Sequence, residues 1–418
     1  MRQINIPNKF SFITKDGDNF DSVFNTFDWN VPNGETVCIN FKDAILGSYQ
    51  ALTLIVQYVY FLKSKGCFVR FLLDDSQGDN ISGMWKRIGG KFVIGAIRNP
   101  NPNIARSYYK PLFLVRDSSD FKKVLEGVKD FVGGFGVNYE KTIRYIISEL
   151  LYNANEHGIS RWKIGATPIP TLFQASWYAK RNEIQFIVSD LGIGIKKHLE
   201  QNHPIFDSAA DAICESLKPK VSGTFGKSSI YTNNNNAGMG LYISNSITRR
   251  TNSNMYIMSG NGFVHISPTD ITKKTLNCEW PGTWVMVQIK ANRFDYGMIM
   301  SEIKNDAEKE IREQDMRQNA VEFCLDMENY FGVYAEVKED AIKFKEKYLI
   351  GAANKGQTIK INFDRIINCP HSFLNALLGD PIKIFIRSGF NPYKKIKIFN
   401  CATEIRETID YIFDDITN

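Results

Sequence analysis

The chain has 418 residues and a formal net charge of +6 at pH 7, with 43% hydrophobic and 23% charged residues. This composition excludes an intrinsically disordered chain and predicts a packed protein of about two to four domains. The weak basic excess allows contact with nucleic acid or acidic partners without supporting either.

Cysteine usage and the N-terminus point to the cell interior. The seven cysteines include no Cys-x-x-Cys pair, so the sequence does not support a zinc site or a redox dithiol. The start, Met1-Arg2-Gln3-Ile4, lacks the apolar core of a signal peptide. The longest apolar run, Ala51 to Leu62, is shorter than the ~20 residues that span a bilayer. We therefore expect a cytoplasmic protein with free thiols and no membrane contact.

The first predicted domain covers residues 1–116. Val37 to Phe41 and Cys67 to Leu73 have the pattern of strands, and Ala51 to Leu62 between them has that of a helix. This alternation predicts a small α/β layer domain.

The second predicted domain covers residues 117–294. An N-cap cluster, Asp117 to Asp120, begins a predicted helix that runs to Val132, and a second helix is expected from Tyr139 to Glu156. Strands are expected at 171–179, 183–189, 255–258, 262–266 and 283–290. Two helices followed by several strands predict an α+β sandwich.

The third predicted domain covers residues 300–418 and is expected to be a smaller α/β domain. The patterns predict helices at 298–316, 340–348 and 372–378, and strands at 358–363 and 382–386. Residues 361–367 resemble residues 39–45, each at the end of a predicted strand. This similarity arises either by chance or because the first domain is a relative of the third.

A polar stripe follows one face of the helix expected at 139–156. Glu149, Asn153 and Glu156 have the spacing i, i+4, i+7, which places them on one side of a helix. The Asn153 carboxamide oxygen suits Mg²⁺, and the Glu149 carboxylate can act as a general base toward water or a hydroxyl. The alternative is a solvated helix face.

The end of the strand expected at 183–189 has the sequence Asp190-Leu191-Gly192-Ile193-Gly194-Ile195. An aspartate at a strand end can accept a hydrogen bond from an exocyclic amine, and the glycines let the backbone approach a flat ring or phosphates. The alternative is a tight turn.

A glycine-rich segment, Ser222 to Ile243, contains Gly226, Lys227, Gly238 and Gly240 and leads into an apolar helix. The N-terminus of a helix binds anions, and a loop of this kind can close over a triphosphate, with Lys227 adding a phosphate contact. The alternative is a flexible surface loop. Further on, Gly282-Thr283 precedes an alternating strand, where the threonine hydroxyl could hydrogen-bond at an adenine edge.

The order of these motifs resembles the boxes of the GHKL (Bergerat-fold) ATPase superfamily. The matching segments are Glu149-x-x-x-Asn153-Ala154-x-x-His157-Gly158, Asp190-x-Gly192-x-Gly194-Ile195, Gly238-Met239-Gly240-Leu241 and Gly282-Thr283. The resemblance implies a GHKL α/β sandwich that binds ATP and Mg²⁺, with Glu149 as general base and Asn153 as Mg²⁺ ligand. It further implies that Asp190 recognises adenine with help from Thr283, that the glycines shape the pocket and its lid, and that Glu156 has a supporting role. The residue before Gly158, His157, is either a site residue or a structural helix-end histidine.

The third domain is similar to the STAS-like domains that accompany such ATPases in bacteria. The similarity rests on Ile361-Asn362-Phe363-Asp364 followed by Ser372 to Gly379. In anti-sigma-factor antagonists a serine at this helix start accepts phosphate from a GHKL kinase. The usual Asp-Ser-Ser-Gly is replaced by Pro370-His371-Ser372-Phe373, so Ser372 is either a phosphoacceptor or simply a helix N-cap.

Three functions remain open. The first is a Mg-ATP-dependent GHKL-type hydrolase that acts as a regulatory switch, in bacterial signalling or defence, through a protein partner or a homodimer. The second is an anti-sigma-type serine/threonine kinase that acts on a STAS-like domain. The third is a non-catalytic, ATP-gated binding module. A histidine autokinase is disfavoured because no histidine precedes the ATPase region, and a topoisomerase because too few residues follow it.

Overall fold

The computed structural model of the protein describes residues 1–74, 80–90, 92–105, 110–132, 136–201, 205–219, 221, 239–290 and 295–417, without the side chains of residues 130, 131 and 311–320. The chain divides into two compact units, Met1–Ala307 and Glu308–Asn418. The chain is mixed α and β, as the sequence predicts, and the predicted boundary between residues 116 and 117 lies inside the first unit.

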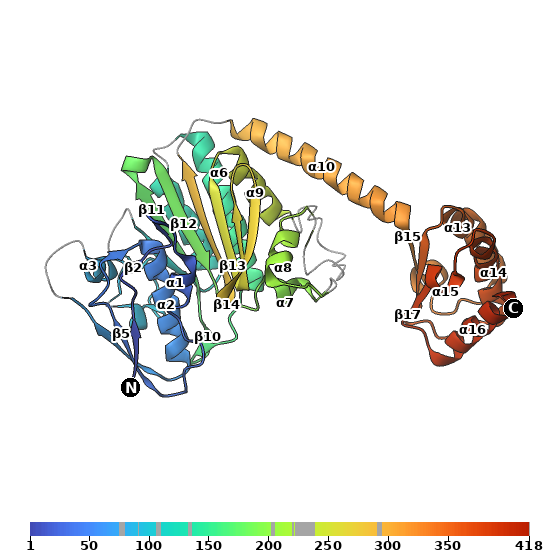
Figure 1. The fold of residues 1–418 in the computed structure, drawn as a ribbon, viewed down its shortest axis with the longest axis horizontal. Helices are drawn as coiled ribbons and strands as arrows, with labels where there is room; N and C mark the ends of the chain where they lie inside the picture. The colour runs from blue at the N-terminus through green and yellow to red at the C-terminus, as the bar shows by residue number, and fades with distance from the viewer. Residues whose placement is uncertain are drawn as a thin grey trace. The chain divides into compact units, whose positions relative to one another are not determined.

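A five-stranded antiparallel sheet forms the centre of the first unit (Figure 1). Its strands, in the spatial order β13-β14-β12-β11-β8, are β8 (Leu112–Val115), β11 (Thr171–Tyr178), β12 (Glu183–Ser189), β13 (Asn254–Ile266) and β14 (Ile271–Lys290). Along β12, Phe186 and Val188 face one apolar core and Ile187 faces another. Both faces of the sheet are therefore covered, which explains why this strand is a nearly continuous apolar run.

Helices cover one face of the sheet and enclose the first of these cores. They are α5 (Ser118–Val132), α6 (Val137–His157), α8 (Ala209–Ser216) and α9 (Gly240–Arg250), with the short α7 (Ile195–Leu199) before α8. The apolar stripe of α6, which includes Ile143, Ile147 and Leu150, is buried against this core. The stripe therefore fixes which side of α6 faces the sheet and which side carries its polar residues.

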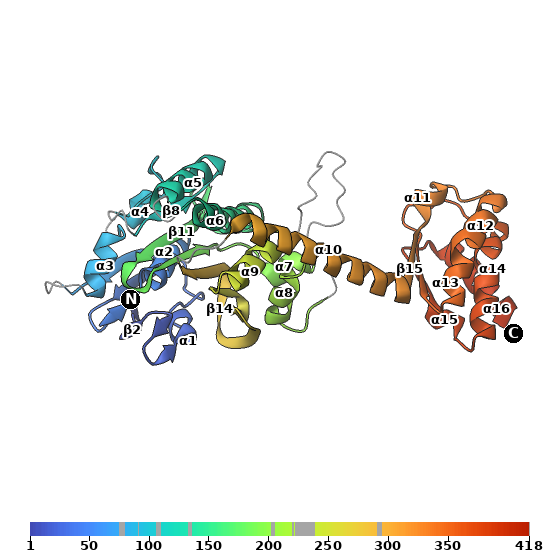
Figure 2. The same ribbon diagram turned by 90° about the horizontal axis from the view of Figure 1, so that it is seen from above.

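The N-terminal residues cover the other face of the sheet (Figures 1 and 2). Their parallel sheet has the order β1-β5-β7, with β1 (Arg2–Asn5), β5 (Thr36–Asn40) and β7 (Phe68–Leu72). The helices are α1 (Phe20–Phe24), α2 (Tyr49–Ser64), α3 (Ile81–Arg87) and α4 (Val93–Ala96). Short strand pairs complete the layer: β2 (Lys9–Phe10) with β6 (Leu46–Gly47), β3 (Ile13–Thr14) with β4 (Gly17–Asp18), and β9 (Lys163–Ile164) with β10 (Thr167–Pro168).

Helix α2 is buried on every side. All residues from Gln50 to Leu62 are buried, and the helix contacts β7 of its own sheet as well as β11 and β12 of the central sheet. A helix that is apolar all round is expected to lie inside a protein rather than on its surface. Aromatic side chains from both layers, among them Phe24, Trp280 and Trp284, share one core with α2.

The second unit contains a parallel sheet with the order β15-β16-β17. Its elements are β15 (Glu322–Asp326), α11 (Met327–Phe331), α12 (Lys338–Phe344), α13 (Ile350–Asn354), β16 (Thr358–Asn362), α14 (His371–Arg387), α15 (Pro392–Lys395), β17 (Ile396–Phe399) and α16 (Thr403–Thr417). Its apolar core is formed by residues from Leu325 to Phe413 and includes no residue of the first unit. Helix α10 (Tyr296–Val321) crosses the division between the units.

The two similar heptapeptides occupy matching places. Asn40 and Asn362 end β5 and β16, each the central strand of its three-stranded sheet. The Asn40 amide donates to Oδ1 of Asn5 on the next strand (3.0 Å), and the Asn362 amide donates to Oδ2 of Asp326 (3.2 Å). In both cases the side-chain oxygen accepts from the backbone N–H two residues later, at 3.1 and 3.2 Å.

Several predicted elements differ from those observed. The strand predicted at Ile382 to Ile386 is wrong, because these residues belong to α14, where Ile382 and Phe385 are buried at helical spacing. The strands predicted at 255–258 and 262–266 form one strand, β13. Strands β8, β15 and β17 and helices α7 and α8 were not predicted from the sequence.

Candidate functional site

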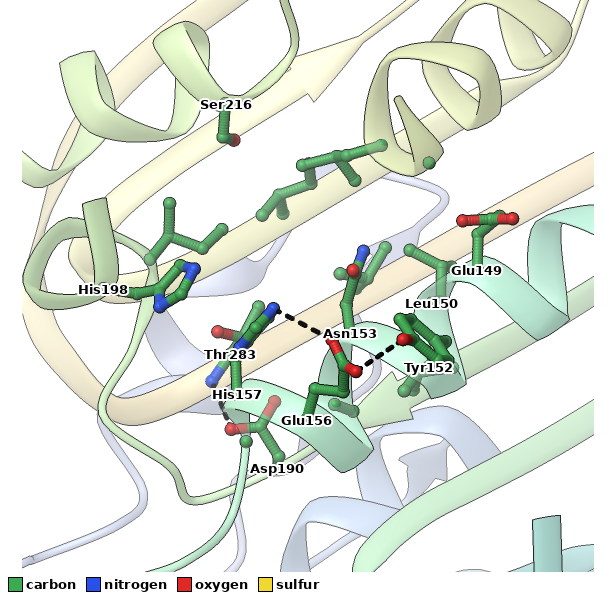
Figure 3. Close-up of a pocket in the computed structure, with 18 of the residues that line it drawn as sticks. Glu149, Leu150, Tyr152, Asn153, Glu156, His157, Asp190, His198, Ser216 and Thr283 are labelled. Carbon is green, nitrogen blue, oxygen red and sulfur yellow. Dashed lines mark hydrogen bonds and ion pairs between the residues drawn. The ribbon is translucent and has the colours of Figure 1, made fainter. Parts of the chain in front are cut away.

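A cavity of about 450 Å³ lies between α6, the start of α9 and the central sheet (Figure 3). Of the residues suggested by the sequence, those lining it are Glu149, Asn153, Glu156, Asp190, Gly194, Ile195, Gly240, Leu241 and Thr283. They come from four separate segments of the chain and meet only through the fold. A cavity of this size is within the range of small-molecule sites.

Helix α6 supplies the polar wall of the cavity. Glu149, Asn153 and Glu156 all line it, although Glu156 is also exposed to solvent. The opposite stripe of α6 is held in the apolar core, which fixes the direction of the polar side chains.

The carboxylate of Glu149 lies directly against the first residue of α9. A Cβ at Gly240 would lie 2.1 Å from Oε2 of Glu149, so a larger residue at this position would displace the carboxylate. Burial raises the pKa of Glu149, and a hydrogen bond from the Tyr145 side chain lowers it in part. A carboxylate with a raised pKa is a better proton acceptor for catalysis near neutral pH.

Asp190 forms the deepest polar part of the site. Its Oδ1 accepts hydrogen bonds from the backbone N–H of Gly192 (2.8 Å) and of Thr283 (3.2 Å). Its own backbone is paired with Thr283 and accepts from the indole of Trp280 (3.1 Å). Burial raises the pKa of the Asp190 carboxyl to about 7, although both backbone N–H groups favour the charged form.

Three glycines enclose Asp190 so closely that no side chain fits. A Cβ at Gly158 would lie 2.7 Å from Cγ of Asp190, and one at Gly282 would lie 2.6 Å from Oδ1. A Cβ at Gly192 would lie 2.5 Å from Cα of Gly158. The backbone therefore approaches the carboxyl from three sides, and Gly192 acts on Asp190 rather than lining the cavity.

The N-terminal layer reaches this site through α2. The buried amide of Gln57 donates to the backbone carbonyl of Ser189 (3.1 Å), next to Asp190, and lies 3.4 Å from the carbonyl of Pro170. The position of the strand end that carries Asp190 thus depends on a residue 132 positions earlier in the chain.

Gly194 and Ile195 are fixed by a serine that the sequence did not single out. Gly194 has φ +78°, which favours glycine. The buried Ser259 hydroxyl donates to the carbonyl of Gly282 and accepts from the N–H of Ile195, both at 2.9 Å. Ser259 therefore joins two of the sequence motifs.

His157 and His198, which both line the cavity, stack with ring centroids 4.1 Å apart. Burial lowers the pKa of His157, and the nearby Glu156, 3.6 Å away, opposes this shift. Glu156 also accepts a hydrogen bond from the Tyr152 hydroxyl, so this side of the cavity is a connected polar group (Figure 3).

The lid motif is described only in part. Gly226, Lys227 and Gly238 lie outside the described residues. Met239 is the N-cap residue of α9 and packs against the helix-side core instead of lining the cavity.

Sequence reasoning missed several lining residues, including Ser148, Tyr152, His198 and Ser216. Ser148 and Tyr152 lie on the same face of α6 as Glu149, so helical spacing alone could have included them. His198 and Ser216 lie on α7 and α8, which no sequence pattern had placed near the cavity.

The donor set suits a magnesium ion better than a metal held only by the protein. Among the described residues, no three or more His, Cys, Asp or Glu side chains are grouped to hold a metal. Mg²⁺ in nucleotide sites is held by one or two protein oxygens, with phosphates and water as the other ligands. The Asn153 carboxamide, one helical turn from Glu149, fits this role.

Ser372 lies in the second unit, on the first turn of α14. The sequence allowed it to be the N-cap, but this is wrong: the N-cap residue is Pro370, whose carbonyl accepts from the N–H groups of Phe373 and Leu374. Ser372 is exposed, so its hydroxyl faces solvent.

A comparison with known families identifies part of the second unit. Residues 340–406 match the family described as STAS-like domain of unknown function (DUF4325). The STAS-like resemblance read from the sequence is thus confirmed for this segment. No curated protein matches the chain significantly in sequence. No helix in the described ranges combines the length and apolar character needed to traverse a bilayer.

Proposed function

We propose that residues 117–294 bind ATP with Mg²⁺ as a GHKL-type ATPase and that nucleotide turnover acts as a regulatory switch for the chain. The observation that carries this proposal is Asp190: a buried carboxyl at a strand end, enclosed by glycine backbone, in a cavity that also contains Glu149 and Asn153. A buried carboxyl facing a small-molecule cavity is suited to an amine-bearing ring, because it supplies a strong acceptor in an apolar surrounding.

Each side chain then has a defined task. Asp190 accepts a hydrogen bond from the exocyclic amine of adenine, while Thr283 adds its hydroxyl at the same edge. Asn153 holds Mg²⁺, which neutralises phosphate charge when it is bound. Glu149, with its raised pKa, takes a proton from the attacking water. The start of α9, in contact with Glu149, offers backbone N–H groups to the phosphates.

The test is γ-labelled ATP with Mg²⁺ and purified full-length protein, with label followed into free phosphate and into protein. Glu149→Gln should keep ATP binding and lower phosphate release by about 100-fold or more. Glu140→Gln is the matched control, because Glu140 is another glutamate of α6 and does not line the cavity. Asp190→Asn should weaken ATP binding by about tenfold or more, and full affinity in this variant would refute the adenine role.

A second function, serine kinase activity toward a STAS-like domain, is favoured by one observation. The chain contains a STAS-like segment, and Ser372 within it has an exposed hydroxyl at the start of a 17-residue helix. In this alternative, Glu149 accepts the hydroxyl proton, and the γ-phosphoryl group moves from ATP to Oγ of the serine, which releases ADP. Label in the protein that disappears in Ser372→Ala supports the kinase, and label only in free phosphate supports the hydrolase. ATP binding with neither product supports a gated binding module.

A further inference from the structure

A second cavity, of about 640 Å³, lies on the face of the central sheet opposite the cavity of Asp190. Its floor is formed by β11, β12 and β14, where Tyr178, Gln185 and Gln288 line it. Its walls are the β3–β4 hairpin and the segment from β6 into α2. Both layers belong to the first unit, so this cavity is enclosed by a single compact body.

The sheet face changes from apolar to polar at this cavity. Ser176, Gln185, Gln288 and Asn254 stand side by side in one register row across β11, β12, β14 and β13. Gln185 and Gln288 are only 6% and 8% exposed. Two residues further along the same strands, Ile187 and Met286 return to the apolar core. A polar row on an otherwise apolar sheet face is costly unless something satisfies its hydrogen bonds.

The buried carboxamides around the cavity have unused hydrogen-bonding groups. Gln50, 1% exposed, accepts from the Tyr178 hydroxyl (3.1 Å), but its Nε2 has no partner among the described residues. The side chain of Gln288 makes no hydrogen bond to any residue in the described ranges, whereas Gln185 donates to Glu183 (2.5 Å). Since nearly all buried polar groups in proteins are paired, these amides are suited to a polar ligand.

The rim of the cavity is positively charged. Lys15 and Arg181 are exposed, and Lys9 is paired with Asp16, the one carboxylate among the described lining residues. The Arg181 guanidinium lies 5.7 Å from the centroid of the Tyr178 ring. Tyr178 lines the cavity and donates its hydroxyl hydrogen bond to Gln50. Two cations therefore remain for an anion, and arginine is well suited to phosphate.

We propose that this cavity binds a small, hydroxyl-bearing organic phosphate of the size of a sugar phosphate. Arg181 and Lys15 bind the phosphate at the rim, and the amides of Gln50 and Gln288 bind hydroxyl groups at the floor. A carboxamide both donates and accepts, as a hydroxyl does, so each hydroxyl can be fully satisfied. The volume lies within the range of small-molecule sites. This site is independent of the proposed nucleotide site, with which it shares no lining residue.

Titration calorimetry of the full-length, nucleotide-free protein with ribose 5-phosphate and glucose 6-phosphate tests the proposal. We expect saturable binding of at least one of them, weakened about tenfold or more by Arg181→Ala and by Gln288→Leu. Lys180→Ala is the matched control, because this exposed cation precedes Arg181 and does not line the cavity. Asn153→Ala serves as the control for the other cavity, and both control variants should bind as the unmodified protein does.

Three results would overturn the proposal. The first is the absence of saturable binding of both compounds up to about 10 mM, well above any specific affinity. The second is sugar-phosphate binding that Asn153→Ala removes, which would assign the ligand to the nucleotide cavity. The third is equal affinity for inorganic phosphate, which would leave the glutamines without a role. Circular dichroism of Gln288→Leu distinguishes lost binding from lost folding, and Arg181→Ala tests the site with an exposed residue.

Discussion

The two three-stranded parallel sheets, β1-β5-β7 and β15-β16-β17, have the same arrangement at the end of the central strand but different surroundings. Asn40 and Asn362 make equivalent hydrogen bonds to the neighbouring strand and to the chain ahead. The N-terminal sheet shares its core with the five-stranded sheet, whereas the C-terminal sheet has a core of its own. The same local structure thus packs on the five-stranded sheet in the N-terminal region and belongs to a separate unit in the C-terminal region.

The helix after each central strand accounts for this difference. Helix α2 is buried on all sides, because one face packs on β7 and the other on β11 and β12. Helix α14 is amphipathic, with Phe373 and Leu377 buried and Asp380 and Lys383 on the outside. The second face of a helix therefore decides whether an α/β layer stands alone or joins a larger body.

The largest effect is expected from separating the two regions. Residues 322–418 expressed alone should fold cooperatively, because their core is complete without other residues. Residues 1–116 alone should not fold, because α2 would expose the face that packs on the central sheet. Amide NMR spectra of both fragments check this, and a dispersed spectrum for residues 1–116 would remove the distinction between the regions.

Matched core truncations should sharpen the comparison. Leu54→Ala in α2 and Leu377→Ala in α14 should each cost about 2–5 kcal/mol, since both leucines are fully buried. Each loss should be confined to its own unit. All six tryptophans lie in the first unit, so tryptophan fluorescence in denaturant should report Leu54→Ala and not Leu377→Ala. A shift of the tryptophan signal in Leu377→Ala would contradict two independent cores.

Only the first unit should couple ligand binding to protonation of a buried aspartate. The pKa of Asp190 is about 7, so the carboxylate that would accept from adenine is lost as the pH falls through 7. ATP affinity should fall by about tenfold from pH 8 to pH 6. The same raised pKa means that the folded state binds this proton more tightly than the unfolded state. The stability contributed by this proton is therefore complete below the ordinary aspartate pKa and is lost as the pH rises toward 7.

The control for this pH dependence is Asp190→Asn, which keeps the shape of the side chain but does not titrate. Its ATP affinity should be weaker and should change less with pH. Because the nucleotide titrates identically in both experiments, comparing the affinities of the two proteins at each pH cancels that contribution. If calorimetry gave the same change of ATP affinity with pH for both proteins, Asp190 would not be the cause of the pH dependence.

The smallest effects are expected at the shared asparagines. Asn40→Ala and Asn362→Ala each remove a side-chain hydrogen bond between strands, so each should cost about 1 kcal/mol in its own unit. Thermal unfolding of both variants measures this cost. A much larger loss at only one position would show that the similarity of the two strand ends is superficial.

The sequence was most informative where one chain segment determines its own structure. The helical stripe of α6 and the strand end at Asp190 were predicted from local spacing, and the structure places both at one cavity. Ser259 and Gln57 could not be found this way, because they act through bonds to backbone atoms far away in the chain. The strand predicted at 382–386 failed because a short apolar run fits a strand as well as a buried helix face.

The bond from Gln57 to the carbonyl of Ser189 also bears on how this protein can be recombined. Asp190 follows a residue that is held from the N-terminal layer, so residues 117–294 do not contain everything that fixes their own strand end. A chimera that transplants only this segment would leave the carbonyl of Ser189 facing an unrelated surface or water. The natural unit of exchange is therefore the whole first unit, including α2, while the STAS-like unit can be replaced as a separate module.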